Sequence, residues 1–86
     1  MKIKKELIKR NIAGDTILVP VGKSVYDSNG LFALNELGAF IWDLLPQAQD
    51  RDALLEAVLA EYDVGREQAA ADLDAFLKKL AKLGIL

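Results

Sequence analysis

The sequence predicts an α+β domain in which a three-stranded antiparallel sheet is followed by three helices. Two patterns predict this class. The first third of the 86 residues is rich in β-branched side chains around a glycine-containing loop, which is typical of a hairpin. The remainder carries apolar residues at helical spacing, interrupted by Pro and Gly. No repeat or low-complexity linker divides the chain, so residues 1–86 are expected to form one domain.

Three short strands are expected, over residues 7–12, 16–21 and 30–34. The first two flank a short loop, residues 13–15, in which Gly14 suits a tight hairpin. Pro20 cannot donate a hydrogen bond to a ladder, so it marks an edge position or the end of the second strand. The polar residues 22–29 are expected to form a loop or a ragged entry to the third strand.

The rest of the chain predicts three amphipathic helices with local start and stop signals. The first begins at an Asn35 cap and the second at an Asp50 cap, because short polar side chains satisfy free N–H groups at helix starts. The third begins near Asp63 or Gly65 and ends at Gly84. The expected apolar stripes are Leu37, Phe40, Ile41, Leu44 and Leu45 in the first helix, Leu54, Leu55, Val58, Leu59 and Tyr62 in the second, and Ala69, Leu73, Phe76, Leu77, Leu80 and Leu83 in the third.

Trp42 lies off the stripe of the first helix, one turn after Gly38. We expect Gly38 to make room for the indole ring against the sheet or another helix. An alternative is that Trp42 fixes the helix on which the third strand rests. Both roles are structural, and neither involves a ligand.

Residues that could perform chemistry are scarce. The chain has no Cys and no His, so thiolate and imidazole ligands and the usual proton shuttle at neutral pH are missing. The Ser and Thr hydroxyls, at Thr16, Ser24 and Ser28, have no His to activate them. Asp72 and Asp74 lie two positions apart on one helix and therefore point to different faces. Enzymatic activity, a metal and a cofactor are not expected.

The net charge and the lengths of the apolar segments limit the classes of partner that we expect. The net charge of −2 argues against a polyanion. No apolar run approaches the roughly 20 residues that span a bilayer, so no membrane partner is expected. The basic N-terminus lacks the apolar segment of a signal peptide, which predicts a cytoplasmic protein.

Three helices beside a small sheet resemble a winged helix-turn-helix, so DNA binding is an alternative. A DNA-reading helix carries basic and amide side chains at its start. The third helix instead begins Arg66-Glu67-Gln68 and gathers its lysines in the last turns, where they complement the helix dipole. Nucleic acid is therefore not expected as the partner.

The predicted third strand has two interpretations. Leu31 and Ala33 face one way and Phe32 and Leu34 the other, so both faces are apolar. The strand is either covered on both faces by the core or forms a partly open edge. An open edge has backbone groups that can pair with an incoming peptide, or with a second copy of the chain in a homodimer.

Either flank of the third helix could form the other wall of a groove beside that edge. On one flank the small Ala75 lies between Asp72 and Lys79, and on the other lie Ala70 and Ala81. A small side chain lets an extended peptide approach closely, although alanine is also a good helix former. The sequence leaves the choice of flank open.

The order of these features resembles the PqqD-like family, the peptide-recognition elements of ribosomal peptide natural-product pathways. The resemblance covers nearly the whole chain and rests on an ordered set of segments. These are Gly30-Leu31-Phe32-Ala33-Leu34-Asn35-Glu36-Leu37-Gly38-Ala39-Phe40-Ile41-Trp42, Tyr62-Asp63-Val64, Asp72-Leu73 with Phe76-Leu77 and Leu80, and Gly84-Ile85-Leu86, with Arg10, Ala13-Gly14 and Val19-Pro20 upstream. Leu37 departs from the family, in which many members carry a small polar residue, and its place on the stripe predicts an effect on packing and not on binding.

The resemblance implies a non-catalytic winged-helix module. Such domains bind the leader segment of a precursor peptide as an added strand and present it to a modifying enzyme, often a radical S-adenosylmethionine enzyme. Here the resemblance implies backbone bonds and pockets at Gly30, Leu31, Phe32, Ala33 and Leu34, and a helical wall of Asp72, Ala75, Phe76 and Lys79. The alternatives are a winged-helix DNA-binding protein and a subunit that only stabilises an enzyme.

Overall fold

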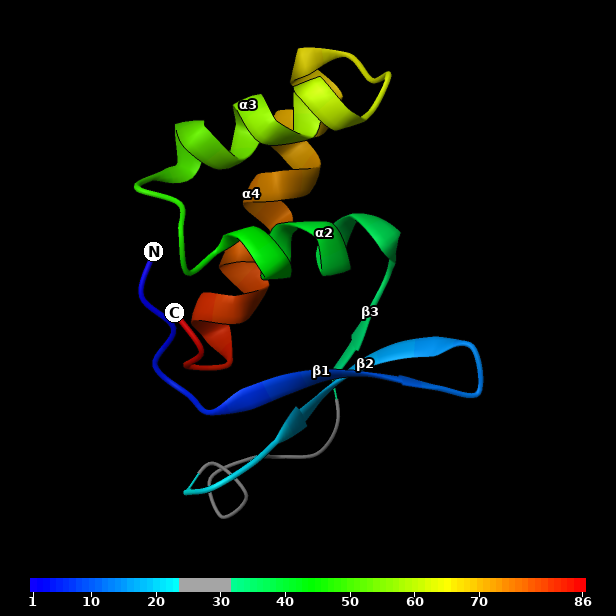
Figure 1. Cartoon of the computed structure of the whole chain (residues 1–86). Coiled ribbons are helices and arrows are strands. Elements are labelled where there is room, and N and C mark those ends of the chain that lie inside the picture. Colours follow the sequence, from blue (N-terminus) through cyan, green and yellow to red (C-terminus); the bar gives the residue numbers. More distant parts are fainter. Residues whose placement is uncertain (24–31) are drawn as a thin grey trace.

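A computed structural model describes residues 1–23 and 32–86 (Figure 1). The elements are β1 (Leu7–Ile12), β2 (Asp15–Pro20), β3 (Phe32–Leu34), α2 (Glu36–Leu44), α3 (Arg51–Glu61) and α4 (Arg66–Lys82). The strands form one antiparallel sheet in the order β1-β2-β3, and the helices follow it in the chain. The predicted α+β class with a winged helix-turn-helix arrangement is confirmed. Gly30 and Leu31 of the predicted third strand, and most of the predicted 22–29 loop, lie outside the described residues.

The turn between β1 and β2 is one residue shorter than predicted. It consists of Ala13 and Gly14, with φ of 51° and 86°, and Asp15 already belongs to β2. Two central residues with positive φ are the requirement of a type I′ turn, whose twist matches that of the flanking strands. Pro20 ends β2, as its missing N–H predicts.

The helix starts follow the predicted caps. Asn35 Oδ1 accepts the N–H of Gly38 at 2.7 Å, and Asp50 Oδ1 accepts the N–H of Ala53 at 2.9 Å. Each bond satisfies one of the N–H groups that a helix leaves without an internal partner. Of the two starts predicted for the last helix, Gly65 is the N-cap of α4.

The end of α4 is tied back to the N-terminal segment. Gly84 has a φ of 75°, and the N–H of Ile85 donates to the carbonyl of Leu80 at 2.9 Å, the bond that defines a Schellman ending. The carbonyl of Ile85 in turn accepts the N–H of Lys4 at 2.7 Å. The two termini therefore lie close together, as Figure 1 shows, and the last turns of α4 are fixed beside the sheet.

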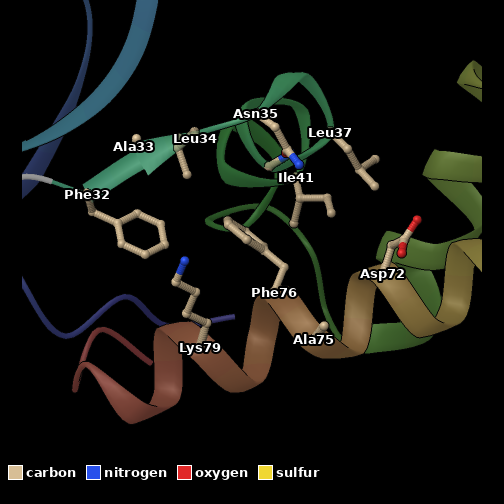
Figure 2. A pocket seen from close by; sticks show the side chains of 11 residues that line it. Phe32, Ala33, Leu34, Asn35, Leu37, Ile41, Asp72, Ala75, Phe76 and Lys79 are labelled. Atoms are coloured by element: carbon tan, nitrogen blue, oxygen red, sulfur yellow. The ribbon is translucent and has the colours of Figure 1, made fainter.

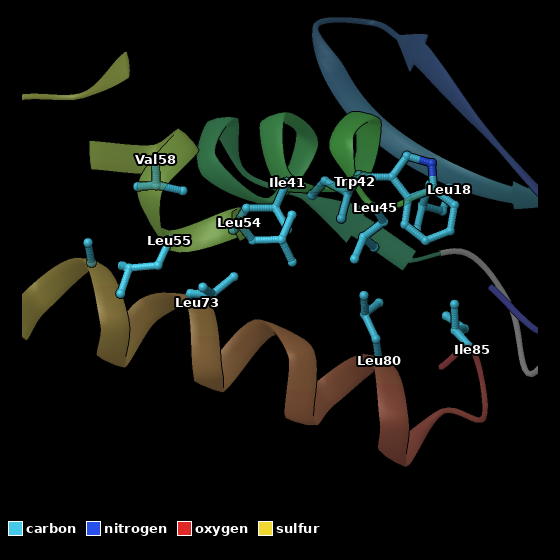
Figure 3. Close-up of a cluster of buried hydrophobic side chains, with 12 residues drawn as sticks. Leu18, Ile41, Trp42, Leu45, Leu54, Leu55, Val58, Leu73, Leu80 and Ile85 are labelled. Carbon is cyan, nitrogen blue, oxygen red and sulfur yellow. The ribbon is translucent and has the colours of Figure 1, made fainter. Parts of the chain in front are cut away.

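The helices cover one face of the sheet and enclose the core (Figures 1 and 3). The buried hydrophobic side chains are Leu18, Leu34, Ile41, Trp42, Leu45, Leu54, Leu55, Val58, Ala69, Leu73, Leu80 and Ile85. Most predicted stripe residues belong to this core or pack against it. Leu83 does not, because it is the C-cap of α4 and remains 39% exposed.

The buried side of α2 is rotated relative to the predicted stripe. Its buried residues are Gly38, Ile41 and Trp42, so Trp42 belongs to the core and is only 7% exposed. A Cβ at Gly38 would lie 3.2 Å from Phe76 Cε1 and 3.5 Å from Leu34 Cδ2. The side chains that lie nearest to Gly38 are thus those of Asn35, Phe76 and Leu34, where the indole of Trp42 was the expected neighbour.

Ion pairs hold α3 against α4. Arg51 Nε donates to Asp74 Oδ1 at 2.8 Å and Arg51 Nη2 to Asp74 Oδ2 at 2.9 Å, and Arg66 pairs with Glu56 at 2.9 Å. The hydrogen bonds from Arg51 lower the pKa of the Asp74 carboxyl below its ordinary value. These arginines are therefore engaged with carboxylates of the domain itself.

Within residues 1–23 and 32–86, no helix has the length and apolar character needed to cross a membrane.

Candidate functional site: a groove beside the free edge of β3

A groove of about 350 Å³ separates β3 and the start of α2 from α4 (Figure 2). Its lining residues are Phe32, Ala33, Leu34, Asn35, Leu37, Gly38, Ile41, Asp72, Ala75, Phe76 and Lys79. The groove follows directly from the sequence order, because α2 begins at Glu36, with only Asn35 between it and the end of β3. The strand, the first turns of α2 and one flank of α4 therefore surround the same space.

The hydrogen-bond pattern of the β1–β2 hairpin determines which backbone groups face which neighbour. Residue pairs of an antiparallel ladder alternate between those that exchange hydrogen bonds and those that do not. Ile12 and Asp15 flank the two-residue turn and therefore form a hydrogen-bonded pair. Every second residue pair from there along the ladder is also hydrogen-bonded. The N–H of Val21, just after β2 and six residues beyond Asp15, donates to the carbonyl of Glu6 at 2.9 Å, and this pair belongs to the same series. Ile17 belongs to that series and directs both backbone groups toward β1.

The same alternation identifies the backbone groups at the open edge of the sheet. The neighbours of Ile17 in β2 face β3, where their register partners are Phe32 and Leu34. Ala33, between these two, therefore directs its N–H and its C=O away from β2. Among residues 1–23 and 32–86, β3 is the last strand of the sheet, so both groups point to an edge that no described strand covers, beside the groove. This edge is called the free edge below.

Apolar side chains form the middle of the groove. Leu34 and Ile41 are buried, and Phe32 and Phe76 are half-buried with their rings directed into the space between β3 and α4 (Figure 2). The side chain of Ala33 points away from α4, as alternation along a strand requires. The side chain of Ala75, near the middle of the α4 wall, is small and fills little of the groove. An extended chain therefore has room to approach α4 there.

Two charged side chains stand on the α4 wall. Lys79 Nζ lies 4.8 Å from the centroid of the Phe32 ring, a cation–π contact. Asp72 Oδ1 accepts a hydrogen bond from Gln68 Nε2 at 2.9 Å and lies at the opposite end of the groove (Figure 2). Both residues are exposed, so both charges are available to a bound chain.

The structure brings together all the described residues that the sequence singled out. Phe32, Ala33 and Leu34 form one wall, and the flank of α4 that carries Asp72, Ala75, Phe76 and Lys79 forms the other. The sequence left open which flank of the last helix faces the groove. The flank with Asp72, Ala75 and Lys79 lines it, and Ala70 and Ala81 of the other flank do not. Gly30 and Leu31 lie outside the described residues.

Four lining residues were missed by the sequence reasoning: Asn35, Leu37, Gly38 and Ile41. Their spacing of three and four positions places them on one face of the first turns of α2, next to the strand they follow. That spacing, together with the absence of a linker after β3, was the available signal. Leu37 packs against the core, as expected, and also lines the groove. That Leu37 leaves binding unaffected stays a prediction.

Among residues 1–23 and 32–86 there is no group of three or more carboxylate or other ligating side chains that could hold a metal ion. The described groove offers instead a free strand edge, apolar pockets and one charge of each sign. Such an arrangement suits an extended peptide, which needs backbone partners and places for alternate side chains.

Comparison with known proteins agrees with this geometry. The family model described as Coenzyme PQQ synthesis protein D (PqqD) matches residues 16–86, which include β2 except for its first residue, β3 and the helices α2, α3 and α4. The chain belongs to the PqqD family. Among curated proteins, no sequence matches the chain significantly.

Two solved structures share the fold of this PqqD-family chain. One is described as TbiB1 in complex with the TbiA(beta) leader peptide, with 29% identity and a TM-score of 0.75, covering 100% of this chain and 94% of that one. The other is described as lasso peptide synthetase B1 complexed with the leader peptide, with 21% identity and a TM-score of 0.73, covering 98% of this chain and 93% of that one. At 21% identity the second likeness shows the fold alone.

Proposed function

We propose that this domain, residues 1–86, binds the leader segment of a ribosomally made precursor peptide and presents it to a modifying enzyme. The leader adds to the sheet as a strand on β3. The observation that carries this proposal is the position of Ala33, whose N–H and C=O face a free edge directly beside a groove walled by α4. Backbone pairing supplies affinity and the pockets for alternate side chains supply specificity.

Membership of the PqqD family supports the proposal, as does the likeness to TbiB1, whose structure was determined with a leader peptide. In this role the domain does not catalyse. It delivers the peptide to a separate protein, for which a radical S-adenosylmethionine enzyme is our proposal. The chain has no Cys to ligate an iron–sulfur cluster, so a cluster of that kind would belong to the partner.

The lining residues have distinct roles in this proposal. Ala33 pairs with the leader backbone; Gly30 and Leu31, for which the resemblance also implies pairing, lie outside the described residues. The half-buried side chains of Phe32 and Phe76 receive the apolar side chains of the leader, while Ala75 leaves space for its backbone. Asp72 and Lys79 set its orientation.

Backbone amide NMR tests the proposal, by titration of the domain with the leader segment of the precursor peptide encoded beside its gene. We expect saturable shifts over residues 32–34 and 72–79 and near-constant signals along the exposed face of α3. No shifts at near-millimolar peptide, with the domain folded, would refute leader recognition. A partner enzyme that binds the domain without the leader would then favour a purely structural subunit.

A homodimer formed through β3 would use the same backbone groups as the leader. Sedimentation of the domain with and without saturating leader peptide checks this competition. We expect any dimer that forms through the edge to dissociate as the leader binds. A dimer that persists unchanged in the complex uses another surface.

A further inference from the structure

The charges on the wall of the groove give it a polarity along its length. Asp72 stands at the end near Leu37, and the ammonium of Lys79 lies over Phe32 at the other end (Figure 2). Between them the α4 wall consists of Ala75 and Phe76. The groove therefore presents a negative charge, an apolar middle and a positive charge in that order.

The direction of an added strand follows from the sheet. All described strand pairs are antiparallel, and antiparallel pairing is slightly more stable per residue than parallel pairing. β3 runs from Phe32 to Leu34, from the Lys79 end of the groove to the Asp72 end. A peptide antiparallel to β3 consequently has its N-terminal part near Asp72 and its C-terminal part near Lys79.

Helix and strand geometry set the spacing of the complementary charges. Asp72 and Lys79 are seven positions apart on α4, which corresponds to about 10.5 Å along the helix axis. Side chains on one face of a strand recur every second residue, or about every 6.8 Å. Because Lys79 leans toward Phe32, away from Asp72, a separation of four residues, about 13.6 Å, fits better than two.

We propose, building on the proposed function, that the groove selects leader segments by the order of their charges. The favoured segment has a basic residue, then an apolar residue, then an acidic residue at alternate positions, read from its N-terminus to its C-terminus. The basic side chain meets Asp72, the apolar one lies against Phe76 beside the small Ala75, and the acidic one meets Lys79. The charges thus act on both the choice of segment and its orientation.

Three synthetic peptides of equal length test this inference. They carry Lys-Thr-Leu-Thr-Glu, Glu-Thr-Leu-Thr-Lys or Gln-Thr-Leu-Thr-Gln between identical Thr and Ser flanks, and their dissociation constants are measured by NMR titration of the folded domain. An exposed ion pair contributes a factor of about 1.4 to 5, so the two pairs together should make the Lys-first peptide bind about 2- to 25-fold more tightly than the uncharged peptide. Its advantage over the Glu-first peptide should be at least as large, because two repulsions are also avoided. This ratio should shrink between about 0.05 and 0.5 M salt.

A charge-swapped domain is the matched control. Asp72 and Lys79 are both exposed, so the double variant D72K/K79D is expected to keep its fold, which urea unfolding checks. The variant should prefer the Glu-first peptide by a similar factor. Reversal of the preference is an outcome that a general effect of peptide charge would not produce.

The remaining outcomes separate this inference from the proposed function. If the natural leader binds in the groove but the three peptides bind equally or not at all, the charge order is refuted and strand addition stands. A preference of the natural domain for the Glu-first peptide also refutes it. If neither the leader nor any of the three peptides binds the folded domain, both leader recognition and the charge order are refuted.

Discussion

Substitution of Ala33 by proline removes one backbone donor from the free edge of β3. The register places the N–H of Ala33 outside the β2–β3 ladder, so the ladder itself loses no hydrogen bond. Proline is tolerated in edge strands where the missing N–H faces solvent, and we expect the free domain to remain folded. In the complex, however, the carbonyl of the leader that pairs with Ala33 would be left without its partner.

The size of the effect follows from that single lost bond. A buried acceptor left unsatisfied costs about 1–3 kcal/mol, which corresponds to about a 5- to 150-fold rise in the dissociation constant. Titration of leader peptide into Ala33→Pro measures this change, and urea unfolding checks the fold. The matched control is Ala33→Val, which keeps the N–H and points its side chain away from α4. We expect this control to change the dissociation constant less than about twofold, or about 0.4 kcal/mol. Wild-type affinity in a folded Ala33→Pro variant would refute strand addition at this residue.

Three further predictions concern the groove and the core. Gly38→Ala adds a methyl group 3.1 Å from Asn35 Oδ1 and 3.2 Å from the Phe76 ring, and both line the groove and must shift slightly, so peptide titration should show weaker binding. Urea unfolding of this variant should change little, because the gain in helix propensity of about 0.8–1.0 kcal/mol offsets the crowding. Leu80→Ala removes most of a side chain that is 0% exposed and leaves a cavity in the core, so it should lower the free energy of unfolding by about 2–5 kcal/mol. Arg51 lowers the pKa of Asp74 below its ordinary 3.8, so this pair contributes stability above that pH and loses it as the pH falls through the lower folded-state pKa. Urea unfolding from pH 6 downward should therefore show a deficit for Asp74→Asn near neutral pH that disappears in acid.

Local signals in the sequence determined the element order and most boundaries. Asn35 and Asp50 cap helices because a short polar side chain satisfies N–H groups only three residues away. Gly84 ends α4 because the left-handed conformation there suits glycine. Each of these effects acts within one turn of the chain, so it can be read without knowledge of the packing. The turn at Ala13 was the exception, since a non-glycine residue with positive φ is uncommon.

Packing between distant segments decided the details of the groove. The first helix has apolar residues on more than one face, from Leu37 to Leu45, so its stripe alone did not specify the rotation about its axis. Contact with α4 and the sheet buries Ile41 and Trp42 and turns Leu37 toward the groove. Two of the three nearest neighbours of Gly38, Leu34 and Phe76, likewise come from β3 and α4, at positions that no spacing within the helix reveals.

The sequence by itself determined that a short apolar strand passes directly into a capped helix, and that the last helix carries Asp72, Ala75 and Lys79 on one flank. Only the tertiary structure decided that this flank faces the strand and that Ala33 directs its backbone groups to the free edge. The physical reason is that periodicity depends on residues a few positions apart. Which faces meet depends instead on the burial of side chains such as Leu18, Ile41 and Leu80, which come from three different elements and are joined only in the folded core.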